Sequence, residues 1–246
     1  MKHQSDILAL KYRPKDFSDL IGQEYLVDTI QKSIQLNKIP NAYIFTGIRG
    51  VGKTTTARIV AKMLNCTAFD NSNKPDLLNC EQAKAITEDR HPDVIEIDAA
   101  SNTSVENARE IIENVKYNPV LGKYKVYIID EVHMLSKSAF NALLKTLEEP
   151  PPHSKFIFAT TEISKVPITI LSRCQRFDLR RIDKKVLSLF LENIANKENI
   201  LIEKEALNLI VKSSDGSVRD ALSILDQANV FKLEETIKTE EIINML

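Results

Sequence analysis

The sequence predicts an α/β fold with a parallel sheet, followed by a small helical domain. Apolar runs typical of buried strands alternate with stretches of helical periodicity in the first part of the chain, which indicates a parallel sheet. The strand pattern stops near residue 180, and helical spacing alone is predicted after it, over 183–195, 203–213, 217–230 and 240–246. We therefore expect one domain over residues 1–179 and a second over 180–246.

Composition excludes several classes of protein. The chain has 246 residues, of which 43% are hydrophobic and 27% charged, as in ordinary soluble domains. No apolar run approaches the roughly 18 residues that span a membrane, and the first residues do not resemble a signal peptide. Three cysteines fit a reducing cytosol, so a cytoplasmic protein is expected. A pI near 6.5 lacks the basic signature of many DNA-binding domains, so nucleic acid would be contacted by a local basic face or through partners.

A glycine-rich loop follows the first predicted strand. Residues 42–45 are an apolar run, and residues 47–54 read Gly-x-x-x-x-Gly-Lys-Thr before a stretch that continues as a helix. Strand, glycine loop and helix form the required context of a phosphate-binding P-loop. Gly47, Gly50 and Gly52 let backbone N–H groups turn inward, where they form a cradle for phosphate with the helix N-terminus.

The residues that close this loop carry its chemistry. Lys53 is expected to reach the β- and γ-phosphates of a nucleotide, and the Thr54 hydroxyl to bind Mg²⁺. We count Thr55, the next residue, among the nucleotide-binding residues.

Two acids end a later strand. Residues 93–99 read as a strand, 105–116 as a helix and 125–131 as a further strand that ends in Asp130 and Glu131. Carboxyl ends of parallel strands meet at one rim of the sheet, so both acids should lie near the P-loop. Asp130 would hold Mg²⁺ and Glu131 would polarise the attacking water. His133 is expected to be a packed or capping residue rather than a general base.

Another strand brings hydroxyl groups to the same rim. A helix is predicted over 136–149 and ends at three prolines, and 155–161 is the next apolar strand. Either Thr160 or Thr161 could bind the γ-phosphate or the attacking water.

The remaining segments are less informative. Residues 8–24 are predicted to be an irregular lead-in and 23–36 a helix. Residues 66–92 are polar and irregular before a helix over 80–88. Cys66 and Cys80 lie there without the paired Cys-x-x-Cys spacing of a four-ligand zinc site.

These motifs together resemble one family of ATPases. Segments 47–54, 130–133, 159–161, 172–174 and 216–221 are similar to those of AAA+ ATPases of the clamp-loader branch. The sequence segments 96–101, 143–151 and 13–24 are most similar to those of the gamma/tau family of bacterial DNA polymerase III. The likeness runs from about residue 8 to the end of the chain, and the Ser-Arg-Cys motif at 172–174 is its most specific part.

The resemblance implies a role for each matching residue. Lys53 and Thr54 match the Walker A pair, and Asp130 and Glu131 the Walker B pair.

Further matches lie outside the two Walker motifs. Thr161 matches sensor 1, Arg173 the arginine finger that acts on ATP held by a neighbouring subunit, and Arg219 the sensor 2 residue that acts in cis. Arg13 and the residues around Pro14 match the segment that lines the adenine pocket.

Two departures from the family pattern qualify the resemblance. The family usually carries a four-cysteine zinc module after the P-loop helix. Cys66 matches its first cysteine and Cys80 its third, whereas Leu77 and Ala83 stand where others would be, so we expect no zinc. The family also continues into a C-terminal collar domain, so the sequence is expected to be a fragment of a longer protein.

The expected function is that of an ATP-dependent motor subunit of a clamp loader. Its implied cofactors are ATP and Mg²⁺, and its implied partners are other loader subunits, the sliding clamp and primer-template DNA. It would belong to a DNA-directed DNA polymerase holoenzyme without being its polymerising subunit. Two alternatives stay open, namely another AAA+ motor such as a branch-migration helicase or protein remodeller, and a nucleotide-gated subunit that does not hydrolyse ATP.

Overall fold

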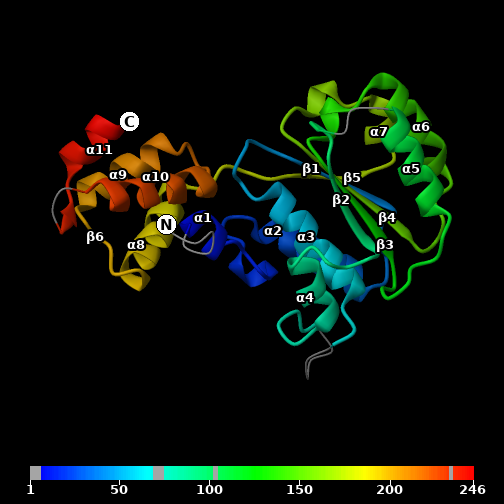
Figure 1. The fold of residues 1–246 in the computed structure, drawn as a ribbon, viewed down its shortest axis with the longest axis horizontal. Helices are drawn as coiled ribbons and strands as arrows, with labels where there is room; N and C mark the ends of the chain where they lie inside the picture. Colours follow the sequence, from blue (N-terminus) through cyan, green and yellow to red (C-terminus); the bar gives the residue numbers. More distant parts are fainter. Residues whose placement is uncertain (1–6, 69–74, 102–104, 233–234) are drawn as a thin grey trace.

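A five-stranded parallel sheet forms the centre of the larger lobe of the molecule (Figure 1). The structure, a computed structural model, describes residues 7–68, 75–101, 105–232 and 235–246. The strand order is β2-β3-β4-β1-β5, and every neighbouring pair is parallel. The strands are β1 (Ala42–Thr46), β2 (Val94–Asp98), β3 (Lys125–Asp130), β4 (Ser154–Thr160) and β5 (Gln175–Asp178).

Helices cover both faces of this sheet and build the second lobe. Short 3₁₀ turns, among them Val132–Met134, lie between them. The helices are α1 (Leu8–Lys11), α2 (Glu24–Gln35), α3 (Lys53–Asn65), α4 (Glu81–Thr87), α5 (Val105–Val115), α6 (Lys137–Glu148), α7 (Ile168–Leu171), α8 (Lys184–Lys197), α9 (Lys204–Ser213), α10 (Val218–Phe231) and α11 (Thr239–Met245).

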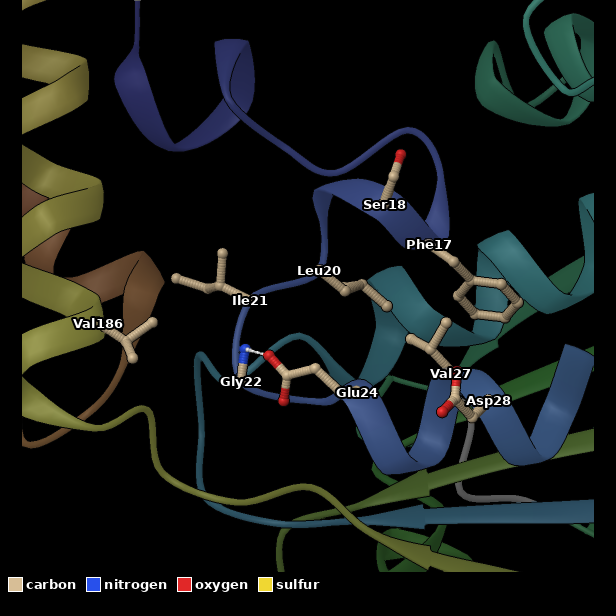
Figure 2. A pocket seen from close by; sticks show the side chains of 9 residues that line it. All are labelled: Phe17, Ser18, Leu20, Ile21, Gly22, Glu24, Val27, Asp28 and Val186. Atoms are coloured by element: carbon tan, nitrogen blue, oxygen red, sulfur yellow. Dashed lines mark hydrogen bonds between the residues drawn. The ribbon is translucent and has the colours of Figure 1, made fainter.

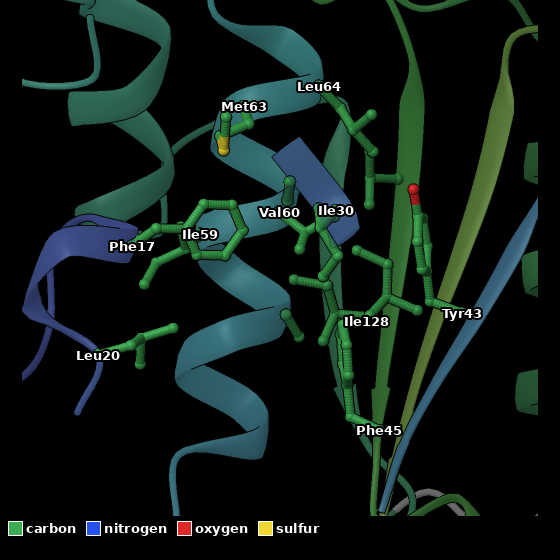
Figure 3. Packing of buried hydrophobic residues seen from close by; sticks show 14 of the residues in the cluster. Phe17, Leu20, Ile30, Tyr43, Phe45, Ile59, Val60, Met63, Leu64 and Ile128 are labelled. Atoms are coloured by element: carbon green, nitrogen blue, oxygen red, sulfur yellow. The ribbon is translucent and has the colours of Figure 1, made fainter. Parts of the chain in front are cut away.

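Successive side chains of the central strands point to opposite faces of the sheet and pack in two separate hydrophobic cores. Tyr43 and Phe45 of β1 pack against α2, α3 and α4 on one face (Figure 3), while Ile44 packs with α5, α6 and α7 on the other. This period of two follows from the pleat of a strand. Because both faces are buried, the strands read as continuous apolar runs in the sequence.

The register aligns the functional ends of the strands. Thr46 at the end of β1 pairs with Thr160 of β4, and Asp98 at the end of β2 pairs with Asp130 of β3. The loops that follow these strands therefore share one rim of the sheet.

The helices α8 to α11 form a second lobe, which lies on the left in Figure 1. It has its own apolar core, built largely from leucine and isoleucine side chains of those helices. Leu8 of α1 is buried in this core too. The N-terminal segment thus crosses from the helical lobe to the sheet.

Several elements differ from the sequence prediction. Residues 8–24 are not wholly irregular, because α1 and the 3₁₀ turn Phe17–Asp19 form there. The strand β5 was not predicted. Its edge position buries only Phe177 among its four residues, which leaves no apolar run to recognise.

The helical lobe is not purely helical either, since β6 (Leu201–Ile202) pairs with β7 (Thr236–Ile237). Expectations for the first six residues and for part of the 66–92 segment lie outside the described residues. Within the parts of the chain that the structure describes, no helix is both long and apolar enough to cross a membrane.

Candidate functional site

The P-loop joins β1 to α3 and is closely packed at two glycines. Gly47 has φ +149°, and a Cβ there would lie 2.6 Å from the carbonyl oxygen of Leu179. Gly50 has φ +78°, and a Cβ there would lie 2.0 Å from Ser217 Oγ, at the start of α10. Gly52, with φ +100°, precedes α3 directly. The loop therefore touches both the end of the sheet and the helical lobe.

Lys53 lies inside this loop. Only 5% of the residue is exposed, and Nζ donates hydrogen bonds to the carbonyl oxygens of Gly47 and Ile48, each at 3.0 Å. Burial lowers the pKa of the ammonium group, while the carboxylates of Glu131 and Asp130 oppose that shift. An ammonium group at the N-terminus of a helix is suited to binding an anion such as phosphate.

The acids at the end of β3 are held in different ways. The Thr54 hydroxyl donates to Oδ2 of Asp130, so the expected magnesium ligands from the P-loop and from β3 are in direct contact. Hydroxyl and carboxylate oxygens are the donors that Mg²⁺ prefers, and this pair fits such an ion. Glu131 has φ +45°, and its Oε2 accepts hydrogen bonds from N and Oγ1 of Thr161 at 3.0 and 2.9 Å.

The structure separates the two threonines that the sequence left as alternatives. Thr161 bonds to Glu131, whereas Oγ1 of the fully buried Thr160 lies 2.9 Å from Nδ1 of His133. The His133 side chain is 6% exposed, which confirms that this histidine is packed.

A cluster of cations lies beside the P-loop helix. Arg13 Nε donates to Thr55 Oγ1 at 3.2 Å, and burial together with the nearby Arg58 lowers the pKa of Arg13. Arg58 forms a bidentate ion pair with Glu96 of β2, at 2.5 and 2.7 Å. Sequence reasoning did not single out Arg58. Its position one helical turn beyond Thr54 was the available signal.

The helical lobe reaches the loop through the N-terminus of α10. The backbone N–H of Arg219 donates to the carbonyl oxygen of Gly50 at 3.3 Å. Ser217 caps the helix, because its side chain accepts a hydrogen bond from the N–H of Asp220. The Arg219 side chain is exposed and close enough to Arg13 to affect its pKa.

Arg173 lies apart from these residues. Its guanidinium forms an ion pair with Glu148 and donates to the carbonyl oxygen of Thr169 at 2.5 Å. Its side-chain hydrogen bonds in the described parts of the chain go to α6, α7 and the adjacent Ser172, and not to the P-loop. The structure thus brings together Lys53, Thr54, Asp130, Glu131 and Thr161, and leaves Arg173 outside that group.

A pocket of about 380 Å³ lies between the N-terminal segment, α2 and α8 (Figure 2). Leu20, Ile21, Val27 and Val186 are among its apolar walls, and Ser18, Glu24 and Asp28 also line it. It borders the P-loop, because Leu20 Cδ2 lies 3.9 Å from the position that a Cβ on Gly52 would take.

The cysteine region does not fit a four-ligand zinc site. Cys66, Leu77, Cys80 and Ala83 are all buried in the same apolar cluster, so two of the four positions offer no ligand atom. Burial raises the pKa of the Cys66 thiol to about 12, whereas at Cys80 the effect of burial is outweighed by hydrogen bonds, first that with Cys66, which lower the pKa to about 7. No group of three or more metal-ligating side chains occurs among the residues that the structure describes.

Comparison with known protein families matches two parts of the chain. Residues 22–183 match the family described as DNA polymerase III, delta subunit. Residues 187–231 match the ATPase lid domain of the DNA polymerase III clamp loader subunit.

Individual relatives agree with these families. The chain is 50% identical over 222 residues to the DNA polymerase III subunit tau/gamma of Haemophilus influenzae, which covers 90% of this chain and 32% of that protein. It is 47% identical over 232 residues to the tau subunit of Bacillus subtilis, covering 92% and 41% of the two chains. The chain thus spans about a third of the length of the first relative and about two fifths of the second.

Solved structures with a similar fold include a more distant protein. The Holliday junction branch migration motor RuvB of Thermotoga maritima superimposes with a TM-score of 0.67 at 19% identity, covering 95% of this chain and 71% of that one. At this identity the likeness shows the fold alone, a parallel-sheet AAA+ core with a helical lid.

Proposed function

Because the chain belongs to the family of DNA polymerase III clamp-loader subunits, with tau and gamma subunits among its relatives, we propose that it binds and hydrolyses ATP to load a sliding clamp onto primed DNA. One observation carries the proposal most directly. Lys53, the Thr54–Asp130 pair and the Glu131–Thr161 pair all lie where the P-loop meets the ends of β3 and β4.

The P-loop and β3 divide the work of binding. Lys53 would exchange the carbonyl oxygens of Gly47 and Ile48 for the β- and γ-phosphates of ATP. Thr54 and Asp130 would hold Mg²⁺, which when bound neutralises charge on the phosphate oxygens. The apolar pocket beside Leu20 is a suitable place for the adenine.

Glu131 would polarise the attacking water, and Thr161 would hold the Glu131 carboxylate in the orientation that this requires. The two hydrogen bonds from Thr161 occupy Oε2, so the carboxylate is oriented before nucleotide arrives. Orientation of this kind lowers the barrier because the cost of ordering the group is met during folding.

Helix α10 would couple the position of the helical lobe to the nucleotide in the P-loop. Ser217 and the backbone of Arg219 touch Gly50, so a phosphate that moves the P-loop would also move this helix. The Arg219 side chain adds a further positive charge near Arg13, from the helical lobe. This position supports a role for Arg219 in contacting the phosphates of ATP bound to its own chain.

Arg173 would act on ATP held by a neighbouring subunit. Its ion pair with Glu148 holds the guanidinium near the surface, away from the P-loop of its own chain. That placement supports a role in trans, with Glu148 as a partner that the finger leaves when subunits meet.

Two other functions predict different behaviour. A branch-migration or remodelling motor is suggested only by the fold, and a nucleotide-gated subunit would not need Glu131 oriented towards a reaction.

A phosphate-release assay on the chain assembled with its loader partners distinguishes the three. We expect hydrolysis stimulated by clamp plus primed DNA. Stimulation by duplex or unfolded protein instead would favour another motor, and absence of hydrolysis a gated subunit.

A further inference from the structure

The most constrained polar group near the proposed site that has no assigned role is the imidazole of His133. It lies in the 3₁₀ turn Val132–Met134, directly after the two acids of β3. Its Nδ1 is 2.9 Å from Thr160 Oγ1 and 3.4 Å from Glu131 Oε2, and its Nε2 is 3.4 Å from Glu162 Oε1. The packed ring thus faces three oxygen atoms, two at Nδ1 and one at Nε2.

The contacts of the two ring nitrogens of His133 differ, and they indicate which nitrogen faces the proposed site. Glu162 is half-exposed and already forms an ion pair with Lys165, at 2.8 Å, so it does not depend on the histidine. Thr160 is fully buried, and its Oγ1 also accepts a hydrogen bond from the N–H of Glu162 at 3.0 Å. The Nδ1 edge faces the buried hydroxyl of Thr160 and the carboxylate of Glu131.

All the contacts to the Glu131 carboxylate converge on one oxygen. Oε2 accepts hydrogen bonds from Thr161 N and Thr161 Oγ1 and lies 3.4 Å from His133 Nδ1, whose hydrogen-bond partner is Thr160 Oγ1, and within the described part of the chain no donor reaches Oε1. The backbone of Glu131 lies in the left-handed region, which L residues adopt at an energetic cost. Several contacts together can hold a strained residue in one orientation.

We propose that His133 is a positioning residue for Glu131. Its Nδ1 edge, held against Thr160, packs 3.4 Å from Oε2 and keeps the carboxylate in place together with the Thr161 hydrogen bonds, so that Oε1 is presented to the water that attacks ATP. The inference rests on the proposed function, because it gives His133 a task only if Glu131 acts in hydrolysis.

Three substitutions separate this role from packing. In His133→Asn the side-chain amide lies near the position of Nδ1, whereas in His133→Gln it lies near that of Nε2. His133→Phe keeps the ring and removes both polar atoms. The variants are compared in the chain assembled with its loader partners, by single-turnover ATP hydrolysis, affinity for a non-hydrolysable ATP analogue and melting temperature.

We expect His133→Phe and His133→Gln to slow single-turnover hydrolysis by roughly 10- to 100-fold, since small displacements of a catalytic group have effects of this size. Nucleotide affinity should stay within about twofold, because the phosphate contacts of Lys53 are untouched, and His133→Asn should recover most of the rate.

Three outcomes would overturn the assignment. Rates equal to wild type in all variants show no positioning role, rescue by Gln rather than Asn assigns the Nε2 edge, and equal losses in all three that parallel melting temperature show packing alone. Failure of the proposed function itself looks different, because the wild-type complex would then either not hydrolyse ATP or not respond to clamp plus primed DNA.

Discussion

Replacing Gly50 by alanine tests the contact between the lid and the P-loop. The new Cβ would lie 2.0 Å from Ser217 Oγ, 3.2 Å from Ser217 Cβ and 3.3 Å from Arg219 Cβ. The hydroxyl must rotate away, and in doing so it loses the hydrogen bond that caps α10. Gly50 also has φ +78°, a conformation that alanine adopts at a cost.

These two effects can be given magnitudes. The left-handed backbone costs about 1–2 kcal/mol for a residue with a Cβ. Loss of a serine cap costs about 1 kcal/mol. Together the unfolding free energy should fall by about 2–3 kcal/mol, which in a chain of this size corresponds to a melting temperature roughly 4–12 °C lower.

The control removes the clash from the other side. Ser217→Gly alone should cost only a few tenths of a kcal/mol, roughly the difference between serine and glycine caps. The double variant Gly50→Ala/Ser217→Gly should be more stable than Gly50→Ala, because no hydroxyl remains to be displaced. Calorimetric melting of the four proteins would refute the reasoning if the two losses simply added, or if Gly50→Ala melted like wild type.

The other predictions concern the proposed site and the cysteines. Lys53→Ala should abolish ATP binding measured by calorimetry, because the loop loses its buried cation, and unchanged affinity would rule out the P-loop assignment. Glu131→Gln should bind ATP and hydrolyse it far more slowly, since an amide cannot polarise water; a wild-type single-turnover rate would mean that another residue is the base. The chain alone should bind ATP but hydrolyse it poorly, and partners should accelerate it by about 10³–10⁵-fold through Arg173. Fast turnover independent of chain concentration, or acceleration that survives Arg173→Ala on the donor subunit, would contradict the role in trans. Elemental analysis should find no zinc at Cys66 and Cys80, and one stoichiometric zinc per chain would reverse that expectation.

The central elements could be predicted because their patterns are strong. β1, β3 and β4 are buried on both faces, so each reads as an unbroken apolar run whose end marks a functional rim. The spacing of Lys53 and Thr54 fixes their place at the start of α3. The parallel topology then brings Asp130 and Glu131 to the same rim without further information.

Other features depend on tertiary contacts that no local pattern records. The edge strand β5 buries only Phe177, so its sequence resembles a loop. The contact of Ser217 with Gly50 joins residues distant in sequence, and a serine before a helix predicts only a cap. The burial of His133 between the ends of β3 and β4 likewise follows from the strand register and not from its own segment.

Clamp loading itself is measured most directly by retention of a sliding clamp on circular primed DNA. The chain, assembled with its loader partners, should leave labelled clamp on the DNA after isolation only when ATP is present, and Lys53→Ala should abolish retention. Clamp retained equally without ATP or with Lys53→Ala, or never retained although the wild-type complex hydrolyses ATP, would contradict the account.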